Sequence, residues 1–273
     1  MTPEVAPTGA TLASFPSFDG SEIAYLDEGT GPLAVLLHGF GSEHRENWVD
    51  TGVVAGLVGA GRRVVAWDAR GHGASAKPHD PAGFAGNAMV RDAGALLDHL
   101  GVTSPRSVDV VGYSMGSVVA SRWVPGDARV RSLVLGGVGD NIANGAREAV
   151  KGRVAPVLLA ESPAEVPDDR LWQMRSSLAD KGNDLRSLAA LDTAGQDDPT
   201  PAQLAAMGVP TLVLTGAEDW FVGPPDALAA RIPGAVVRTV PGDHLSACDT
   251  PAFAAAIVEF VTAPTQQSED TAP

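Results

Sequence analysis

The 273-residue sequence contains a single cysteine, Cys248, which excludes an intrachain disulfide and a cysteine-cluster metal site. Positive charge is also scarce, and the formal net charge of −14 argues against a nucleic-acid-binding surface, which needs a basic patch. No apolar run reaches the roughly 18 residues of a membrane span, and Met1 to Thr11 lacks the pattern of a secretory signal. We therefore expect a cytoplasmic globular protein without nucleic-acid or membrane partners.

Length and hydrophobic patterning indicate one large α/β domain with a small insertion. Alternating segments around Asp19-Gly20 predict an opening antiparallel hairpin. Later apolar runs alternate with stretches of helical periodicity, which is typical of a mostly parallel sheet with helices on both faces. The predicted strands span 11–18, 22–27, 32–37, 63–67, 108–111, 131–135, 210–215 and 235–240, and the predicted helices of this domain span 47–60, 87–100, 225–232 and 253–261.

The alternation of strands and helices stops between residues 140 and 207. Helix-like stretches over 146–160, 169–179 and 184–190 are separated there by several prolines, without a convincing strand. We interpret this region as a helical cap inserted between two strands of the sheet. The predicted organisation is therefore a flexible N-terminus (1–11), a core domain (12–139 and 208–262), a helical cap (140–207) and a disordered C-terminal tail (263–273).

The stretch most indicative of chemistry is Gly112-Tyr113-Ser114-Met115-Gly116, which follows an apolar, β-branched run and precedes a run of small residues. A G-x-S-x-G pattern between a strand and a helix is typical of a nucleophile elbow. The turn needs strained dihedral angles at the serine, and glycines on both sides let the strand and helix approach closely. We expect Ser114 Oγ to lie exposed above the C-terminal end of the strand.

A serine hydroxyl is a weak nucleophile at neutral pH, so Ser114 needs a neighbouring base. Among six histidines, His244 fits best, because it follows the last predicted strand in a glycine-containing loop that lets the imidazole reach back over the sheet edge. The base in turn needs a carboxylate, and Asp219 lies just beyond the preceding strand. Glu218 and Asp140 are alternatives for this carboxylate.

Acyl chemistry also needs hydrogen-bond donors for a developing oxyanion. We assign this role to the backbone N–H groups of Phe40, in a glycine loop held by His38, and of Met115, directly after the serine. Tyr113 and Trp172 are candidate substrate contacts. Asp68, Arg70 and His72 are expected to stabilise a tight loop by hydrogen bonds, and no binding role is assigned to the arginines of the predicted cap, Arg147, Arg153, Arg170, Arg175 and Arg186.

The chain resembles the α/β-hydrolase superfamily, in particular its small esterases, enol-lactonases, cofactor-free haloperoxidase-like enzymes and C–C bond hydrolases. The resemblance covers Glu22 to about Val261. It implies an eight-stranded sheet with a small helical cap and a catalytic triad of Ser114, Asp219 and His244, which follow the family's chain order. The blocks that carry it are His38-Gly39-Phe40-Gly41, Asp68-Ala69-Arg70-Gly71-His72-Gly73-Ala74-Ser75, Gly112-Tyr113-Ser114-Met115-Gly116, Gly216-Ala217-Glu218-Asp219 and Gly242-Asp243-His244.

The expected reaction is hydrolysis of a small carboxylic ester or lactone through an acyl-enzyme at Ser114, which requires no metal or organic cofactor. In haloalkane dehalogenases and epoxide hydrolases the elbow residue is an aspartate, whereas a serine indicates a carbonyl electrophile. Two alternatives use the same scaffold: hydrolysis of a C–C bond in a vinylogous diketone, and a ligand receptor with little turnover. The sequence leaves acyl length, leaving group, stereochemistry and oligomeric state open.

Overall fold

The computed structural model describes residues 11–145 and 151–263, which form one eight-stranded sheet. The strands are β1 (Thr11–Pro16), β2 (Glu22–Glu28), β3 (Leu33–Leu37), β4 (Arg63–Trp67), β5 (Val108–Tyr113), β6 (Val130–Gly136), β7 (Thr211–Gly216) and β8 (Val236–Val240). Their order in the sheet is β1-β2-β4-β3-β5-β6-β7-β8, and only the β1–β2 and β2–β4 pairings are antiparallel. The predicted mostly parallel α/β-hydrolase fold is confirmed.

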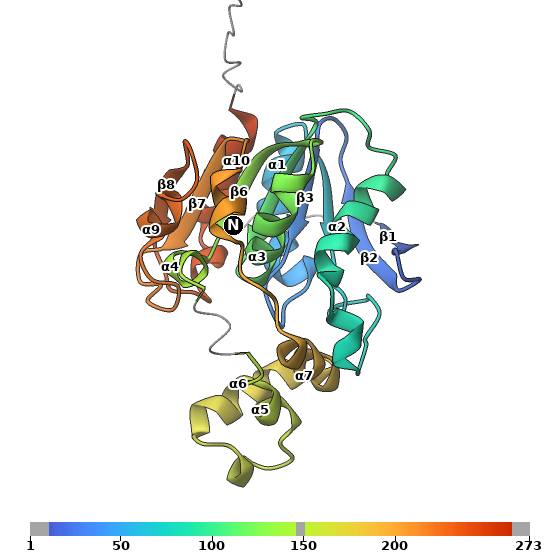
Figure 1. Cartoon of the computed structure of the whole chain (residues 1–273), viewed down its shortest axis with the longest axis vertical. Helices are drawn as coiled ribbons and strands as arrows, with labels where there is room; N and C mark the ends of the chain where they lie inside the picture. The colour runs from blue at the N-terminus through green and yellow to red at the C-terminus, as the bar shows by residue number, and fades with distance from the viewer. Residues whose placement is uncertain (1–10, 146–150, 264–273) are drawn as a thin grey trace, which may run out of the picture.

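Helices cover both faces of this sheet (Figure 1). One face is covered by α2 (Ala88–His99), α3 (Met115–Trp123) and α9 (Pro225–Ala229), and the other by α1 (Val53–Gly59) and α10 (Pro251–Thr262). Every residue of β3 and β5 is buried. This explains why the central strands read as continuous apolar runs rather than as alternating ones. None of the helices within the described residues is long and apolar enough to cross a membrane.

Two predicted helices are wrong in part. The helix predicted over 47–60 divides into η1 (Arg45–Val49) and α1, because Gly52 between them has φ +80° and ends the helical path. Within the described part of the helix predicted over 146–160, only α5 (Ala155–Leu159) is helical, and Gly152 at φ +71° lies in the turn before it. Residues 146–150 lie outside the described residues, as do 1–10 and 264–273 of the predicted terminal segments.

The helices between β6 and β7 fall into two groups. Figure 1 shows α5, α6 (Asp169–Asp180) and α7 (Leu185–Ala194) beyond one end of the sheet, whereas α4 (Asp140–Ala143) lies beside α9. Ile142 of α4 and Leu204 of α8 (Pro201–Ala205) belong to the main core. We call residues 151–195 the cap segment. Short 3₁₀ turns complete the structure: η2 (Pro81–Phe84), η3 (Val124–Gly126), η5 (Pro163–Glu165) and η6 (Ala247–Asp249).

Candidate active site

The turn between β5 and α3 holds Ser114 in a strained conformation. Its backbone adopts φ +48° and ψ −109°, and its N–H donates to Gly136 O at 2.8 Å. The flanking glycines are required by crowding: a Cβ at Gly116 would collide with the carbonyl group of Leu37, and one at Gly112 would lie 2.6 Å from a backbone nitrogen of α3. Backbone packing thus accounts for the pentapeptide and lifts the serine above the end of β5.

Ser114, His244 and Asp219 form a continuous hydrogen-bonded path. His244 Nε2 lies 3.0 Å from Ser114 Oγ, and His244 Nδ1 lies 2.8 Å from Asp219 Oδ2. Because an ionised carboxylate only accepts hydrogen bonds, Nδ1 carries the proton and Nε2 is left to accept from the serine hydroxyl. Among the described residues no partner contacts Asp219 Oδ1, which is buried. The carboxylate is therefore directed at the imidazole.

The two alternative carboxylates have other partners. Glu218 Oε2 accepts the backbone N–H of Gly242 at 2.6 Å and so helps to hold the loop that carries His244. Asp140 Oδ1 accepts the side-chain amide of Asn144 at 2.6 Å. Of the three candidate carboxylates, the structure brings Asp219 to the imidazole.

Tyr113 supports His244 from the protein side. Its hydroxyl donates to the backbone oxygen of His244 at 2.6 Å, and the two rings stack with centroids 5.7 Å apart. Burial raises the pKa of the Tyr113 hydroxyl, which keeps it protonated as a donor. Gly137 provides space, because a Cβ there would lie 3.3 Å from His244 Cε1. The structure thus places Tyr113 beneath the imidazole, whereas the sequence predicted a substrate contact.

The two proposed oxyanion donors belong to the same cavity as Ser114. Phe40 and Met115 both line it, the first from the loop after β3 and the second from the start of α3. Neither backbone N–H has an acceptor among the described residues. Both amides are thus available to a ligand atom near the serine.

Buried hydrogen bonds hold the loop that contains Phe40. His38 Nε2 accepts the N–H of Ala69 at 2.9 Å, and His38 Nδ1 donates to Gly39 O at 2.7 Å. Burial lowers the pKa of His38, which favours the neutral ring that this pattern needs. Asn47 Oδ1 accepts the N–H of Gly39 at 2.9 Å. The role expected of His38 is confirmed, but Asn47 was missed because it lies in a stretch predicted only from its helical periodicity.

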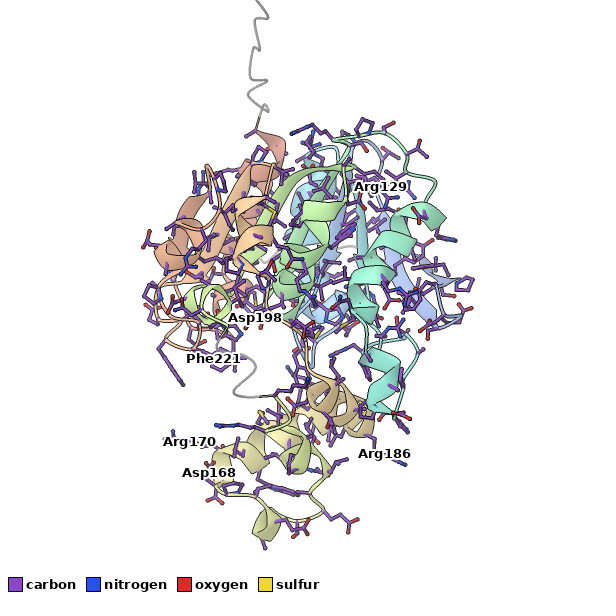
Figure 2. All side chains as sticks on the ribbon, viewed as in Figure 1. Arg129, Asp168, Arg170, Arg186, Asp198 and Phe221 are labelled. Atoms are coloured by element: carbon purple, nitrogen blue, oxygen red, sulfur yellow. The ribbon has the colours of Figure 1, made fainter. Side chains whose placement is uncertain are left out.

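A cavity of about 380 Å³ opens above Ser114. Trp172 is not among the described residues that line it; its ring packs under the Arg175 guanidinium at 4.9 Å. Phe221 does line the cavity and lies 5.0 Å from the His244 ring, and Figure 2 shows it on the core side of the space between core and cap. The lining residues are Phe40, Ser114, Met115, Gly137, Val138, Asn141, Lys151, Val154, Leu191, Asp192, Gly195, Gln196 and Phe221.

Arg70 joins the loop after β4 to helix α2 and to the turn between β1 and β2. Arg70 donates to Asp92 at 2.7 Å and to Asp19 at 2.9 Å. His72 is fully buried, and burial lowers its pKa to about 3, so its ring is neutral at physiological pH. These contacts confirm that Arg70 and its neighbours stabilise a tight loop.

Glu43, His44 and Asp68 form the one cluster among the described residues whose ligand atoms are close enough together for a metal ion. His44 Nδ1 lies 2.9 Å from both an Asp68 and a Glu43 oxygen. Burial opposes ionisation of His44, but the hydrogen bonds to the two carboxylates outweigh it and raise its pKa to about 9. A protonated imidazole therefore pairs with both carboxylates at neutral pH, and the three side chains form an ion-pair network.

Known proteins resemble this chain along most of its length. A model of the alpha/beta hydrolase family matches residues 34–257. The chain is 29% identical over 257 residues to a non-heme chloroperoxidase of Kitasatospora aureofaciens, covering 82% of this chain and 88% of that protein. A solved structure of a hydrolase from Pseudomonas aeruginosa has a TM-score of 0.72 at 29% identity, covering 94% of this chain and 100% of that one. The enol-lactonase from Burkholderia xenovorans LB400 has a TM-score of 0.74 at 23% identity, with 92% and 100% covered. Since the family model spans most of the sequence, the chain belongs to the alpha/beta hydrolase family.

Proposed function

We propose that this protein hydrolyses a small carboxylic ester or lactone, with Ser114 as the nucleophile, His244 as the general base and Asp219 as its carboxylate partner. The observation that carries the proposal is the hydrogen-bonded path from Ser114 Oγ through His244 to Asp219, at the floor of an open cavity. A hydroxyl, an imidazole and a carboxylate in this order activate a serine for attack on a carbonyl carbon.

In the proposed acylation step, His244 Nε2 takes the hydroxyl proton while Ser114 Oγ bonds to the carbonyl carbon. The carbonyl oxygen becomes an oxyanion, and the N–H groups of Phe40 and Met115 donate to it. The intermediate then collapses, and the departing alkoxide takes the proton from His244 to leave as an alcohol. In a lactone this alcohol stays attached to the acyl group.

Deacylation repeats these events with water as the nucleophile. His244 Nε2 takes one proton from the water while its oxygen attacks the acyl carbon, and the same two amides hold the second oxyanion. Collapse breaks the bond to Ser114 Oγ, which regains its proton from His244. The carboxylic acid is released and the enzyme is restored.

The experiment that tests this proposal compares Ser114→Ala with wild-type protein on a panel of short-chain aryl esters and lactones. We expect kcat/KM to fall by roughly 10⁴-fold or more, because the nucleophile is lost while the oxyanion donors remain. Ser104→Ala is the matched control, since Ser104 is an exposed serine in the loop before β5, at the opposite end of that strand from Ser114. A fluorophosphonate should label wild-type protein at Ser114 and leave Ser114→Ala unlabelled.

The same panel separates the other functions that this scaffold allows. For this purpose a vinylogous diketone is added to the panel, and turnovers are counted per enzyme molecule. Rapid multiple turnover of esters or lactones supports the proposal. Preferential cleavage of the diketone, a single slow turnover, or full ester turnover by Ser114→Ala contradicts it.

A further inference from the structure

The cavity above Ser114 is mostly apolar but contains one cation among its described lining residues, Lys151. This lysine belongs to the cap segment. Apolar side chains surround the same space: Phe40, Met115, Val138, Val154, Leu191 and Phe221. A ligand that fills the cavity would contact mainly apolar groups and, on the cap side, a single ammonium group.

Contacts of its stem hold Lys151 in this position. The backbone at Gly195 has φ +68°, and a Cβ there would lie 2.6 Å from Lys151 Cδ and 2.7 Å from Cε, so the stem runs over the bare face of this glycine. The backbone of the next residue is also held in place, because the N–H of Gly152 donates a hydrogen bond to Asp192 O at 3.0 Å. The lysine itself is exposed, which leaves its ammonium group free to meet a ligand.

No carboxylate among the described residues forms an ion pair with Lys151. Among the described lining residues the one acidic residue is Asp192, whose Oδ2 accepts the N–H groups of Val154 at 2.9 Å and Ala155 at 2.7 Å. These two bonds anchor the start of α5 and partly neutralise the carboxylate. The ammonium group is therefore available to an anion brought by the ligand.

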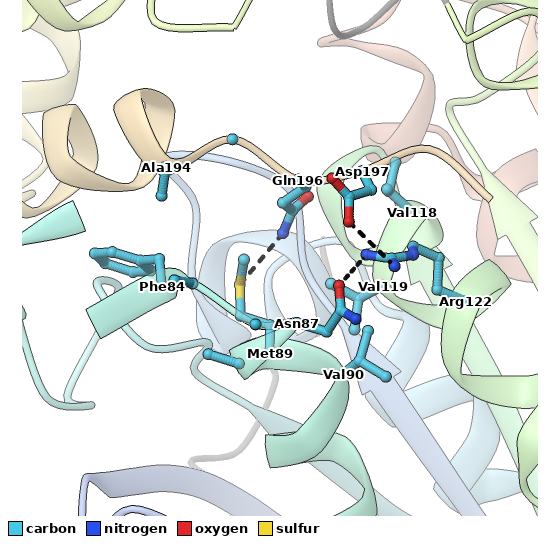
Figure 3. A pocket seen from close by; sticks show the side chains of 14 residues that line it. Phe84, Asn87, Met89, Val90, Val118, Val119, Arg122, Ala194, Gln196 and Asp197 are labelled. Carbon is cyan, nitrogen blue, oxygen red and sulfur yellow. Dashed lines mark hydrogen bonds and ion pairs between the residues drawn. The ribbon is translucent and has the colours of Figure 1, made fainter. Parts of the chain in front are cut away.

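In a second pocket the cation is paired by other side chains of the protein, unlike Lys151. It shares Gly195 and Gln196 with the catalytic cavity, and its cation is Arg122. Figure 3 shows this guanidinium group bonded to Asn87 and paired with Asp197, the latter at 3.3 Å. The protein thus satisfies the cation of this pocket with its own side chains.

The arginines on the outside of the cap segment do not supply a positive charge to the cavity above Ser114. Arg170 and Arg186 are exposed, and Figure 2 shows both on the cap helices, projecting outward. No arginine is among the described residues that line the catalytic cavity, and Arg147 lies outside the described residues. The protein's net charge of −14 repels anions at long range, so recognition of an anion here depends on the local amine.

We propose that Lys151 binds a carboxylate at the far end of the substrate, so that the preferred substrate class is a monoanionic ester or lactone. The simplest member is a hemiester of a dicarboxylic acid. Its ester carbonyl lies at Ser114, its methylene chain lies against the apolar lining, and its free carboxylate pairs with the ammonium group. This inference rests on the proposed function of Ser114.

The test compares kcat/KM for aryl hemiesters of succinate, glutarate and adipate with kcat/KM for the matching amides, in which –CONH₂ replaces the free carboxylate. We expect wild-type protein to prefer the best-fitting anion by about 10- to 100-fold, mainly through KM. Lys151→Met should bring this ratio close to one, and added salt should reduce it in wild-type protein. Lys181→Met is the matched control, because it removes one positive charge from a cap lysine that pairs with Glu46.

A binding measurement makes the outcome independent of turnover. Calorimetric titration of Ser114→Ala with glutarate and adipate should show binding that is lost in Ser114→Ala/Lys151→Met. Absent turnover of both the anionic and the neutral esters contradicts the role of Ser114, while dicarboxylate binding still reports on Lys151. Equal rates for anionic and neutral esters, a preference that survives in Lys151→Met, or the same loss in Lys181→Met would overturn the inference.

Discussion

Two sides of the same cavity are built differently. The floor, formed by Phe40, Ser114, Met115 and Gly137, lies on the ends of buried strands and is held by backbone hydrogen bonds and fully buried side chains. The cap segment opposite has only a small core of its own: Ala155, Leu158, Leu188 and Ala189. The residues proposed to react are therefore positioned by the whole sheet, whereas the cap wall of the cavity depends on a few local contacts.

After Ser114→Ala, the largest effect is expected on the floor, from Asp219→Asn. An amide in place of the carboxylate no longer holds the His244 tautomer that accepts from Ser114, so kcat on a short aryl ester should fall by roughly 10³- to 10⁴-fold. Glu218→Gln is the matched control, since Glu218 bonds to Gly242 rather than to the imidazole. Steady-state kinetics of both variants decide the assignment, and the reverse ranking would transfer the role to Glu218.

Gly116→Ala should damage the floor through packing alone. The new methyl group would collide with the carbonyl group of Leu37. This backbone group lies in the buried strand β3, so it cannot shift without a large cost in free energy. We expect a loss of about 3 kcal/mol in the free energy of unfolding, measured by urea denaturation. Gly94→Ala in α2 is the control, because a Cβ there meets nothing within 4 Å and should stabilise the helix by about 0.5–1 kcal/mol. Equal stability of the two variants would contradict the crowding argument.

The floor was predictable because its residues follow from local backbone rules. A strained serine needs glycines such as Gly116 beside it, and His244 follows a strand whose C-terminal end must lie at the active edge of a parallel sheet. The cap side was not predictable in the same way. Lys151 reaches the cavity from a turn at Gly152 where periodicity indicated a helix, and the Trp172 ring packs against Arg175 and is not among the described residues that line the cavity. Helical periodicity does not specify which neighbour a short helix packs against.

The two sides should also differ in how histidine pairs respond to pH. His44, which directly precedes η1 in the core domain, has its pKa raised to about 9 by Asp68 and Glu43, so it adds stability below about pH 6.5 that is lost as pH rises through about 9. We expect wild-type protein to lose roughly 1–2 kcal/mol over this range relative to His44→Gln, after allowance for partial exposure. Denaturation curves at pH 6 and pH 9.5 measure the difference.

His79, in the core segment before η2, provides the comparison because it pairs with Asp184 of the cap segment. Its Nε2 lies 2.8 Å from Asp184 Oδ2, but both side chains are partly exposed, so solvent screens the pair. His79→Gln should change stability by no more than about 0.5 kcal/mol at either pH. A larger pH effect from His79→Gln than from His44→Gln would mean that the cap, and not the floor, depends on its charged pairs.

A modest effect on both stability and kcat is expected where the two sides meet. Leu178 of α6 covers Gly41, next to Phe40, and Leu178 and Phe40 both pack against the small cap core. Leu178→Ala should therefore cost only about 1–2 kcal/mol of stability, because the side chain is half-buried, yet lower kcat severalfold by loosening the loop that carries the Phe40 N–H. Leu159→Ala is the matched control, since Leu159 of α5 is 55% exposed. Thermal unfolding and ester kinetics are measured for both variants. A drop in kcat confined to Leu178→Ala would show that the cap segment helps to position the loop that carries the Phe40 N–H. Unchanged kcat in both variants would mean that the floor works independently of the cap segment.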